Sequence, residues 1–315
     1  MKKISHIFGP VPSRRLGRSL GIDLVPFKTC SFDCVYCQLG RTTNLTVKCD
    51  NYYDPDEILD DFKEKLKKDK SCAGADYITI SGSGEPTLNS SIGRIIDEIK
   101  SITDIPVSVL TNGSMLWKND VADALMNADL VAPSLDGGTD EVFRLVNRPA
   151  EGLVFEQIIS GLESFTGKFR GDVWLEVFLL KNISDNEKEI EAVKRNLKGV
   201  RTDRIQLNTV ARPACENFAL PVTRLKMETL LTLLPGNAEV IADFSMQERE
   251  VFREADEQEV LNLLERRPCT KEDMSVSLGM HLNEVVKLIE VLERSGLIMN
   301  EIKNGSSYYF SAAHG

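Results

Sequence analysis

Short runs of apolar and β-branched residues alternate along most of the chain with stretches in which apolar residues recur at helical spacing. The runs predict strands at residues 19–24, 76–80, 106–110, 130–133, 173–179 and 204–207. The amphipathic stretches predict helices at residues 55–68, 92–101, 118–127, 152–165, 185–197 and 222–234. This alternation is typical of a parallel sheet, either an open doubly wound sheet or an incomplete α/β barrel. In both, the loops after the strands build the active site.

The end of the chain has a different pattern. Apolar residues at helical spacing predict helices at residues 256–266 and 283–294, and the capping-box sequence of residues 270–273 predicts a further helix between them. An Asn-Gly pair at residues 304–305 then lies between two β-prone segments, which is a strong hairpin signal. Three helices followed by a hairpin predict a winged helix-turn-helix domain.

We accordingly predict an α/β protein with two domains: a partial (βα)6 barrel of parallel strands at residues 1–250 and a winged helix-turn-helix domain at residues 251–315. The chain of 315 residues, with 42% hydrophobic and 27% charged residues, has the composition of a globular protein. It contains no apolar run near the about 18 residues that a membrane span needs, and its start has no apolar signal-peptide region. We expect a cytoplasmic protein that does not bind membranes.

Charge is distributed unevenly along the chain. The net charge of −10 argues against a general nucleic-acid binder. The first predicted strand is nevertheless preceded by a basic segment that contains Arg14, Arg15 and Arg18 and no acidic residue. We expect this segment to bind an anionic substrate, such as a carboxylate, a phosphate or the tRNA backbone. The last predicted helix is rich in glutamate, so we expect the C-terminal domain to contact a protein or gate the substrate; DNA binding is disfavoured, and RNA binding stays open.

Three of the seven cysteines, Cys30, Cys34 and Cys37, form a C-x3-C-x2-C sequence just after the first predicted strand. An odd number of cysteines in a cytoplasmic protein fits metal or thiol chemistry better than disulfides. Thiolates this close in sequence can surround one compact metal centre. An iron–sulfur cubane usually takes four cysteines, so three leave one iron open to another ligand. A structural zinc ion with Cys49 as the fourth ligand is the alternative.

A glycine-rich turn, Ser81-Gly-Ser-Gly-Glu-Pro86, directly follows the second predicted strand. Glycine lets a backbone approach a ligand closely, and the turn lacks the Lys-Ser/Thr of a phosphate-binding P-loop. We expect it to present Glu85 at the barrel mouth.

Together, the C-x3-C-x2-C sequence, with Tyr36 before its last cysteine, and Gly84-Glu85-Pro86 resemble the radical S-adenosylmethionine (SAM) superfamily over residues 19–210. The resemblance implies that the cysteines hold a four-iron four-sulfur (4Fe-4S) cluster whose open iron is chelated by SAM, with Gly84, Glu85 and Pro86 at the SAM amino group. It further implies reductive cleavage of SAM to a deoxyadenosyl radical that abstracts a hydrogen atom from the substrate. The electron donor would be a protein such as flavodoxin or ferredoxin.

The resemblance also implies cofactor contacts after the later strands. Ser134 lies in a segment similar to one whose serine meets the SAM carboxylate. Arg148 can clamp the same carboxylate in bidentate fashion, with Arg144 as its competitor. Asn112 and Arg212 are further candidate contacts.

Two residues have open roles. Cys215, after the sixth predicted strand, is a candidate hydrogen-atom donor or radical carrier, and packing of a free thiol is the simpler alternative. Glu176 alternates with apolar residues in the fifth predicted strand, so it points either into the barrel or to solvent.

Within the superfamily, the chain is similar to the tRNA wybutosine-synthesis radical enzyme and its uncharacterised relatives at residues 84–86, 110–113 and 134–136. We find neither that enzyme's additional N-terminal cysteines nor its flavodoxin-like domain. Three functions stay open. The first is a radical SAM enzyme acting on a small molecule, a peptide or a partner protein; the second is a tRNA-modifying radical SAM enzyme; the third is a zinc-bearing winged-helix regulator without radical chemistry.

Overall fold

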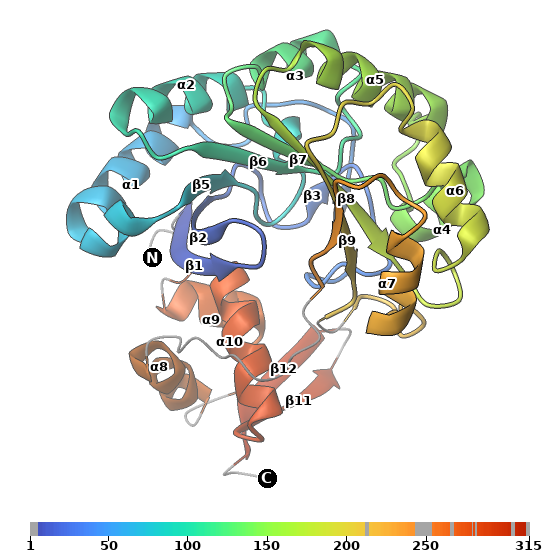
Figure 1. Ribbon diagram of the computed structural model, residues 1–315. Helices are drawn as coiled ribbons and strands as arrows, with labels where there is room; N and C mark the ends of the chain where they lie inside the picture. The colour runs from blue at the N-terminus through green and yellow to red at the C-terminus, as the bar shows by residue number, and fades with distance from the viewer. Residues whose placement is uncertain are drawn as a thin grey trace.

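The computed structural model describes residues 6–211, 214–242, 254–264, 268–278, 280, 282–303 and 306–312. Within these residues, one sheet of eight strands forms the centre of the larger domain, in the order β1-β2-β5-β6-β7-β8-β9-β10 (Figure 1). The strands are β1 Ile7–Ser13, β2 Gly17–Ile22, β5 Tyr77–Ile80, β6 Val107–Thr111, β7 Leu130–Pro133, β8 Asp172–Leu179, β9 Arg204–Thr209 and β10 Ala238–Val240. Neighbouring strands from β2 to β10 run parallel, and β1 is antiparallel to β2. The predicted α/β architecture with a mostly parallel sheet is confirmed.

Helices cover the outer face of this sheet, and Figure 1 shows them as an arc around it. They are α1 Pro55–Lys68, α2 Ile92–Ile102, α3 Asn119–Ala124, α4 Asp140–Asn147, α5 Phe155–Lys168, α6 Glu187–Asn196 and α7 Arg224–Leu231. α1 begins where predicted because the Asp54 carboxylate accepts a hydrogen bond from the Asp56 amide and Pro55 occupies the first turn. None of the described helices is long and apolar enough to cross a membrane.

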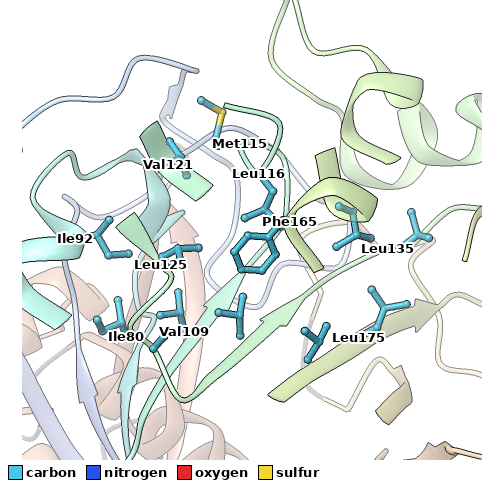
Figure 2. Close-up of a cluster of buried hydrophobic side chains, with 14 of the residues drawn as sticks. Ile80, Ile92, Val109, Met115, Leu116, Val121, Leu125, Leu135, Phe165 and Leu175 are labelled. Carbon is cyan, nitrogen blue, oxygen red and sulfur yellow. The ribbon is translucent and has the colours of Figure 1, made fainter. Parts of the chain in front are cut away.

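The main core lies between the sheet and these helices (Figure 2). Strand residues reach it at every second position: Ile78 and Ile80 of β5 are fully buried in it. Thr79, between them, belongs to the opposite face, where its hydroxyl lies 2.6 Å from that of Ser19 and 3.0 Å from that of Ser108. The outer face of the sheet is therefore an apolar layer, and its inner face carries polar side chains.

The sequence predicts neither β1 nor β10, and it misses α4. β1 contains Pro10 and Pro12, which lack the N–H donor of a central strand, but β1 lies at the edge of the sheet, where proline is tolerated. β10 has only three residues, too few to show an alternating pattern. The basic N-terminal segment is thus an edge strand followed by a turn.

The C-terminal part contains the expected helices and hairpin in its described residues. They are α8 Glu254–Leu264, α9 Lys271–Leu278, α10 Leu282–Arg294, β11 Ile298–Lys303 and β12 Ser306–Ser311. Their apolar side chains form a cluster separate from the main core, with Val260, Met274, Val285, Leu288 and Leu292 among its buried members. The Asn-Gly pair of the hairpin lies outside the described residues. The assignment of these elements to a winged helix-turn-helix stays a prediction.

Candidate functional site

The loops after β2, β5, β6 and β7 lie at the same end of the parallel strands and bring the sequence motifs together. The cysteine loop, residues 28–40, follows β2, and backbone hydrogen bonds fasten it to the end of α4 and the turn beyond. The Val35 amide donates to the Val146 carbonyl at 2.9 Å, and the Ala150 amide donates to the Ser31 carbonyl at 2.9 Å. The position of the cysteines is therefore fixed by the fold of the barrel.

Each of the three cysteine sulfurs accepts a hydrogen bond from a different side chain. The pairs are Asn112 Nδ2 to Cys30 Sγ at 3.6 Å, Asn147 Nδ2 to Cys34 Sγ at 3.4 Å and Lys28 Nζ to Cys37 Sγ at 3.1 Å. All three cysteines are free of disulfides. Burial raises the pKa of Cys30 to about 12 and also raises the pKa of Cys34. Their thiolate forms therefore need a bound cation to become favourable.

The donor set fits an iron–sulfur cluster better than a single metal ion. Among the described residues, no three His, Cys, Asp or Glu side chains converge closely enough to hold one ion. Cys49, the fourth ligand in the zinc alternative, lies with its sulfur 3.9 Å from the Thr87 carbonyl oxygen. A zinc ion needs four ligands, with thiolates at about 2.3 Å, whereas a 4Fe-4S cluster presents a separate iron to each cysteine. The three cysteines can hold such a cluster.

The glycine-rich turn is tied to both neighbouring loops. A Cβ atom at Gly84 would stand 1.9 Å from the Thr29 carbonyl oxygen, so only glycine lets the cysteine loop approach this closely. Glu85 is 2% exposed, and its carboxylate accepts bonds from the Thr87 amide and hydroxyl, the Thr111 hydroxyl and the Asn112 amide. Glu85 therefore does not project from the barrel mouth as expected; it is buried and fixes the shape of the turn.

Tyr36 connects the cysteine loop to the segment after β7. Its hydroxyl donates to Asp136 Oδ2 at 2.5 Å, and its ring stacks on Phe178 with the centroids 3.9 Å apart. Asn147 Nδ2 also donates to Asp136 Oδ2, at 2.7 Å, and the Phe178 amide donates to Oδ1 at 3.1 Å. Burial raises the pKa of Asp136 to about 6, although the bonds from Tyr36 and Asn147 favour its charged form.

Asn112 lies beside the cysteine loop, and Ser134, which follows β7, lies beside the end of β6. Asn112 Nδ2 donates to Ser31 Oγ at 2.8 Å as well as to the Cys30 sulfur. The Ser134 amide donates to the Thr111 carbonyl at 3.1 Å, and Ser134 is partly exposed. Asn112 thus contacts the cysteine loop directly, whereas Ser134 contacts the strand end that precedes Asn112.

Arg148 is engaged by acidic neighbours. Its guanidinium donates to Glu216 Oε1 at 2.7 Å and lies 3.9 Å from Asp33 Oδ2. Arg144, the competitor, forms an exposed ion pair with Asp140 of its own helix. Nη1 of Arg148 makes both of its contacts, so a bidentate clamp on a further carboxylate would use Nε and Nη2.

Cys215 lies next to Glu216, in the segment after β9. The Glu216 amide donates to the Val35 carbonyl at 3.0 Å, which places this segment against the cysteine loop. Cys215 is partly buried, and that burial raises the pKa of its thiol. The candidate contact Arg212 lies outside the described residues.

Two of the three N-terminal arginines reach into the barrel. Arg15 forms an ion pair with Glu176 of β8 at 2.9 Å, and Arg14 donates to Asn208 Oδ1 of β9 at 3.1 Å. Asn208 in turn donates to Glu176 Oε1 at 2.7 Å. Burial alone would raise the pKa of Glu176, but Arg15 and Asn208 together lower it. Arg18 lies apart and exposed, where its guanidinium donates to a backbone carbonyl oxygen at 3.2 Å.

The C-terminal domain contacts the barrel beside the cysteine loop, and Figure 1 shows α9 and α10 below β1. One contact reaches the cysteine loop, one β1 and one the segment after β9. They are Lys271 Nζ to the Leu39 carbonyl at 3.1 Å, the Gly9 amide to Glu284 Oε1 at 2.7 Å and the Arg294 guanidinium to the Ala211 carbonyl at 3.3 Å. The C-terminal part thus contacts both β1, at one edge of the sheet, and the segment after β9.

Sequence reasoning missed Lys28, Asp136 and Asn147 as site residues. Asp136 and Asn147 each stand within two residues of a residue that was singled out, but nothing local indicates that both meet the cysteine loop. Lys28, two residues before the first cysteine, has only its proximity to the motif as a signal. The roles of Asp136 and Asn147 depend on contacts between segments far apart in the sequence, and that of Lys28 depends on how the cysteine loop folds back on itself.

A model of the radical SAM superfamily matches residues 24–193 of this chain. Over 310 residues, 98% of the chain, it is 39% identical to a protein of Brachyspira hyodysenteriae named GTPase Obg, but this match spans only 45% of that relative's length. It is 31% identical to a UPF0026 protein of Methanocaldococcus jannaschii, over 96% of the chain and 94% of the relative. A radical SAM methyltransferase from Sphaerobacter thermophilus has a similar fold, with a TM-score of 0.57 at 15% identity, over 72% of this chain and 67% of that one.

Proposed function

We propose that this chain, which belongs to the radical SAM superfamily, binds its 4Fe-4S cluster through Cys30, Cys34 and Cys37 and acts on an anionic substrate inside the barrel. The chain is an enzyme of the radical SAM kind, and the cofactors of that family are a 4Fe-4S cluster and SAM. The observation that supports the residue assignment most is the set of three free sulfurs, each with its own N–H donor from a different part of the barrel. When bound, the two cofactors supply reductive cleavage of SAM and a radical that removes a hydrogen atom from the substrate.

The residues around the cysteines would hold SAM in place. Because Glu85 uses its carboxylate within the protein, we assign the SAM amino group to the backbone carbonyls of the turn at residues 84–86, whose shape Glu85 fixes. Ser134 is partly exposed, and its hydroxyl can donate to the SAM carboxylate. Asn112 would first have to release Ser31 or the Cys30 sulfur, because both N–H groups of its amide are engaged. Arg148 would join through Nε and Nη2, because its Nη1 binds Glu216.

We assign the substrate's negative charge to Arg14 and Arg15. Arg15 is held inside the barrel by Glu176, and Arg14 by Asn208, so both guanidinium groups stand on the inner side of the sheet. An anion that binds there would replace the Glu176 carboxylate as the partner of Arg15. Because Arg15 is held inside the barrel by Glu176 and its side chain is only 12% exposed, we favour a small-molecule or peptide substrate over tRNA, whose backbone binds to a positive outer surface.

Two further assignments complete the proposal. A small cytoplasmic electron carrier such as flavodoxin or ferredoxin would reduce the cluster, as radical SAM enzymes generally need such a reductant. The C-terminal part would gate access to the site, because it touches the cysteine loop, β1 and the segment after β9.

The test uses two cysteine variants of the full chain, reconstituted with iron and sulfide without oxygen. Cys34→Ala should lose the cluster and the formation of deoxyadenosine from SAM under dithionite. Cys49→Ala, the matched control, should retain both, because Cys49 serves only the zinc alternative. If Cys34→Ala keeps a full cluster and cleaves SAM at the normal rate, the assignment of the ligands is wrong.

A further inference from the structure

Lys28 is a buried cation whose ammonium group donates to a cysteine sulfur. Its side chain is 3% exposed, and its Nζ lies 3.1 Å from Cys37 Sγ. Among the described residues, no carboxylate oxygen forms an ion pair with this ammonium group. A buried charge without an opposite charge is strongly destabilising, so the position of Lys28 requires a nearby anion.

The backbone at Lys28 holds the side chain in this place. The Lys28 amide donates to the Ser83 carbonyl at 2.7 Å, and the Lys28 carbonyl accepts from the Asn44 amide at 3.1 Å. Lys28 also has a positive φ of 57°, a conformation that residues other than glycine rarely adopt. The chain thus accepts local strain and keeps a long cationic side chain directed at the cysteine loop.

We propose that Lys28 is a positioning residue for the iron–sulfur cluster: its ammonium group donates a hydrogen bond to the Cys37 sulfur and raises the reduction potential of the cluster. The proposal rests on the proposed function, because it takes the three cysteines as the cluster ligands. The other two sulfurs accept hydrogen bonds from the neutral amides of Asn112 and Asn147. Among these three donors, Lys28 alone carries a positive charge.

Electrostatics gives the direction of the effect. An electron that enters the cluster adds negative charge, so a fixed cation stabilises the reduced form more than the oxidised form. Hydrogen bonds to the sulfurs and the net charge around the cluster are the main protein controls on its potential. A charged donor also forms a stronger hydrogen bond than a neutral amide does.

Lys271, in the C-terminal part, is a second cation near the cysteine loop whose effect on the reduction potential can be compared with that of Lys28. Its Nζ donates to the Leu39 carbonyl at 3.1 Å and lies 5.3 Å from the centre of the Phe27 ring, so it touches the cysteine loop without bonding to a sulfur. Replacing it should shift the potential in the same direction as replacing Lys28, but by less.

The experiment measures the midpoint potential of the reconstituted full-length protein by an anaerobic redox titration followed by electron paramagnetic resonance, with iron and sulfide assayed on the same samples. Lys28→Met removes the charge and keeps most of the side-chain volume; Lys28→Arg keeps the charge. Lys48→Met is the matched control, because Lys48 is exposed and pairs with Asp50 on the same segment of the chain.

We expect a more negative potential for Lys28→Met at unchanged iron content, a potential near that of the unaltered protein for Lys28→Arg, and no shift for Lys48→Met. Lys28→Met with full iron and an unchanged potential would overturn the proposal. If Lys28→Met binds no iron, retention of the cluster by Lys28→Arg supports the role of the charge, and its loss there contradicts it. An unaltered protein without any cluster would contradict the proposed function itself.

Discussion

The hydroxyl of Tyr36 donates a hydrogen bond of 2.5 Å to Asp136, which joins the cysteine loop to the segment after β7 across 100 residues of sequence. The same carboxylate accepts a bond from Asn147, whose amide also reaches the Cys34 sulfur. A single buried acid, 3% exposed, therefore organises both the aromatic residue of the cysteine motif and a donor to one of its sulfurs. The protonation of Asp136 is coupled to the geometry of the site.

This coupling predicts a pH dependence of stability. Asp136 has an ordinary pKa of 3.8 when unfolded and about 6 when folded, mainly because burial disfavours its charge. Between these values the folded state holds a proton that the unfolded state has released. The resulting stabilisation is complete below the lower pKa and is lost as the pH rises through the upper one. The loss amounts to about 3 kcal/mol.

Chemical denaturation of the cofactor-free protein and of Asp136→Asn, from about pH 4 to pH 7, measures this effect. The free energy of unfolding of the unaltered protein, minus that of Asp136→Asn, should fall as the pH rises across this range. A difference that stays constant with pH would show that Asp136 titrates normally.

The close contact at Gly84 predicts that a larger side chain there weakens cluster binding. Gly84→Ala places a methyl group 1.9 Å from the Thr29 carbonyl oxygen, so the turn and the cysteine loop must separate. Overpacking of this kind costs about 1–3 kcal/mol, and we expect the iron content after reconstitution to fall as well. Gly167→Ala is the control, because nothing lies within 4 Å of its added Cβ in helix α5, and it should be stabilising and retain full iron. Normal iron content in Gly84→Ala would contradict the close contact.

The ion pair of Arg15 and Glu176 predicts a non-additive pair of substitutions. Arg15→Met leaves the Glu176 carboxylate without its cation, which should cost the lower end of about 3–5 kcal/mol, because both side chains keep some exposure. Adding Glu176→Gln should recover most of that loss. The measurement is a double-mutant cycle on the free energy of unfolding, and additive losses would show that the two side chains are not coupled.

The separate apolar cluster of the C-terminal part predicts a tolerated truncation. Removal of residues 251–315 takes away the contacts of Lys271, Glu284 and Arg294 with the barrel but none of the main core. We expect the shortened chain to fold, to bind the cluster and to form deoxyadenosine. Far-ultraviolet circular dichroism and iron analysis check the result, and unfolding of the barrel would show that the two parts are one cooperative unit.

The strands and most helices could be predicted from the sequence because their signal is local. β7 and α1 begin and end at the predicted residues, and buried residues such as Ile78 and Ile80 repeat with the period of a strand. β1 escaped prediction because its prolines argue against a strand, and only its place at the sheet edge makes them acceptable.

Part of the site was predictable because its sequence signal is also local. The cysteine motif and the glycine-rich turn are contiguous in sequence, and strand order alone brings them to one end of the barrel. The bonds of Asn147 and Arg148 depend on which loops meet in space, and the bond of Lys28 to Cys37 depends on how the cysteine loop folds back on itself. No periodic pattern carries that information. The sequence left open whether Glu176 points into the barrel or to solvent. Its ion pair with Arg15, a residue in another segment, directs it inward.

The most direct test of the account is the metal content of the unaltered protein, prepared without oxygen, followed by its reaction with SAM and dithionite. We predict four irons and four sulfides per chain, as one 4Fe-4S cluster requires, and the formation of deoxyadenosine and methionine. Stoichiometric zinc without iron or sulfide, and no cleavage of SAM after reconstitution, would contradict it.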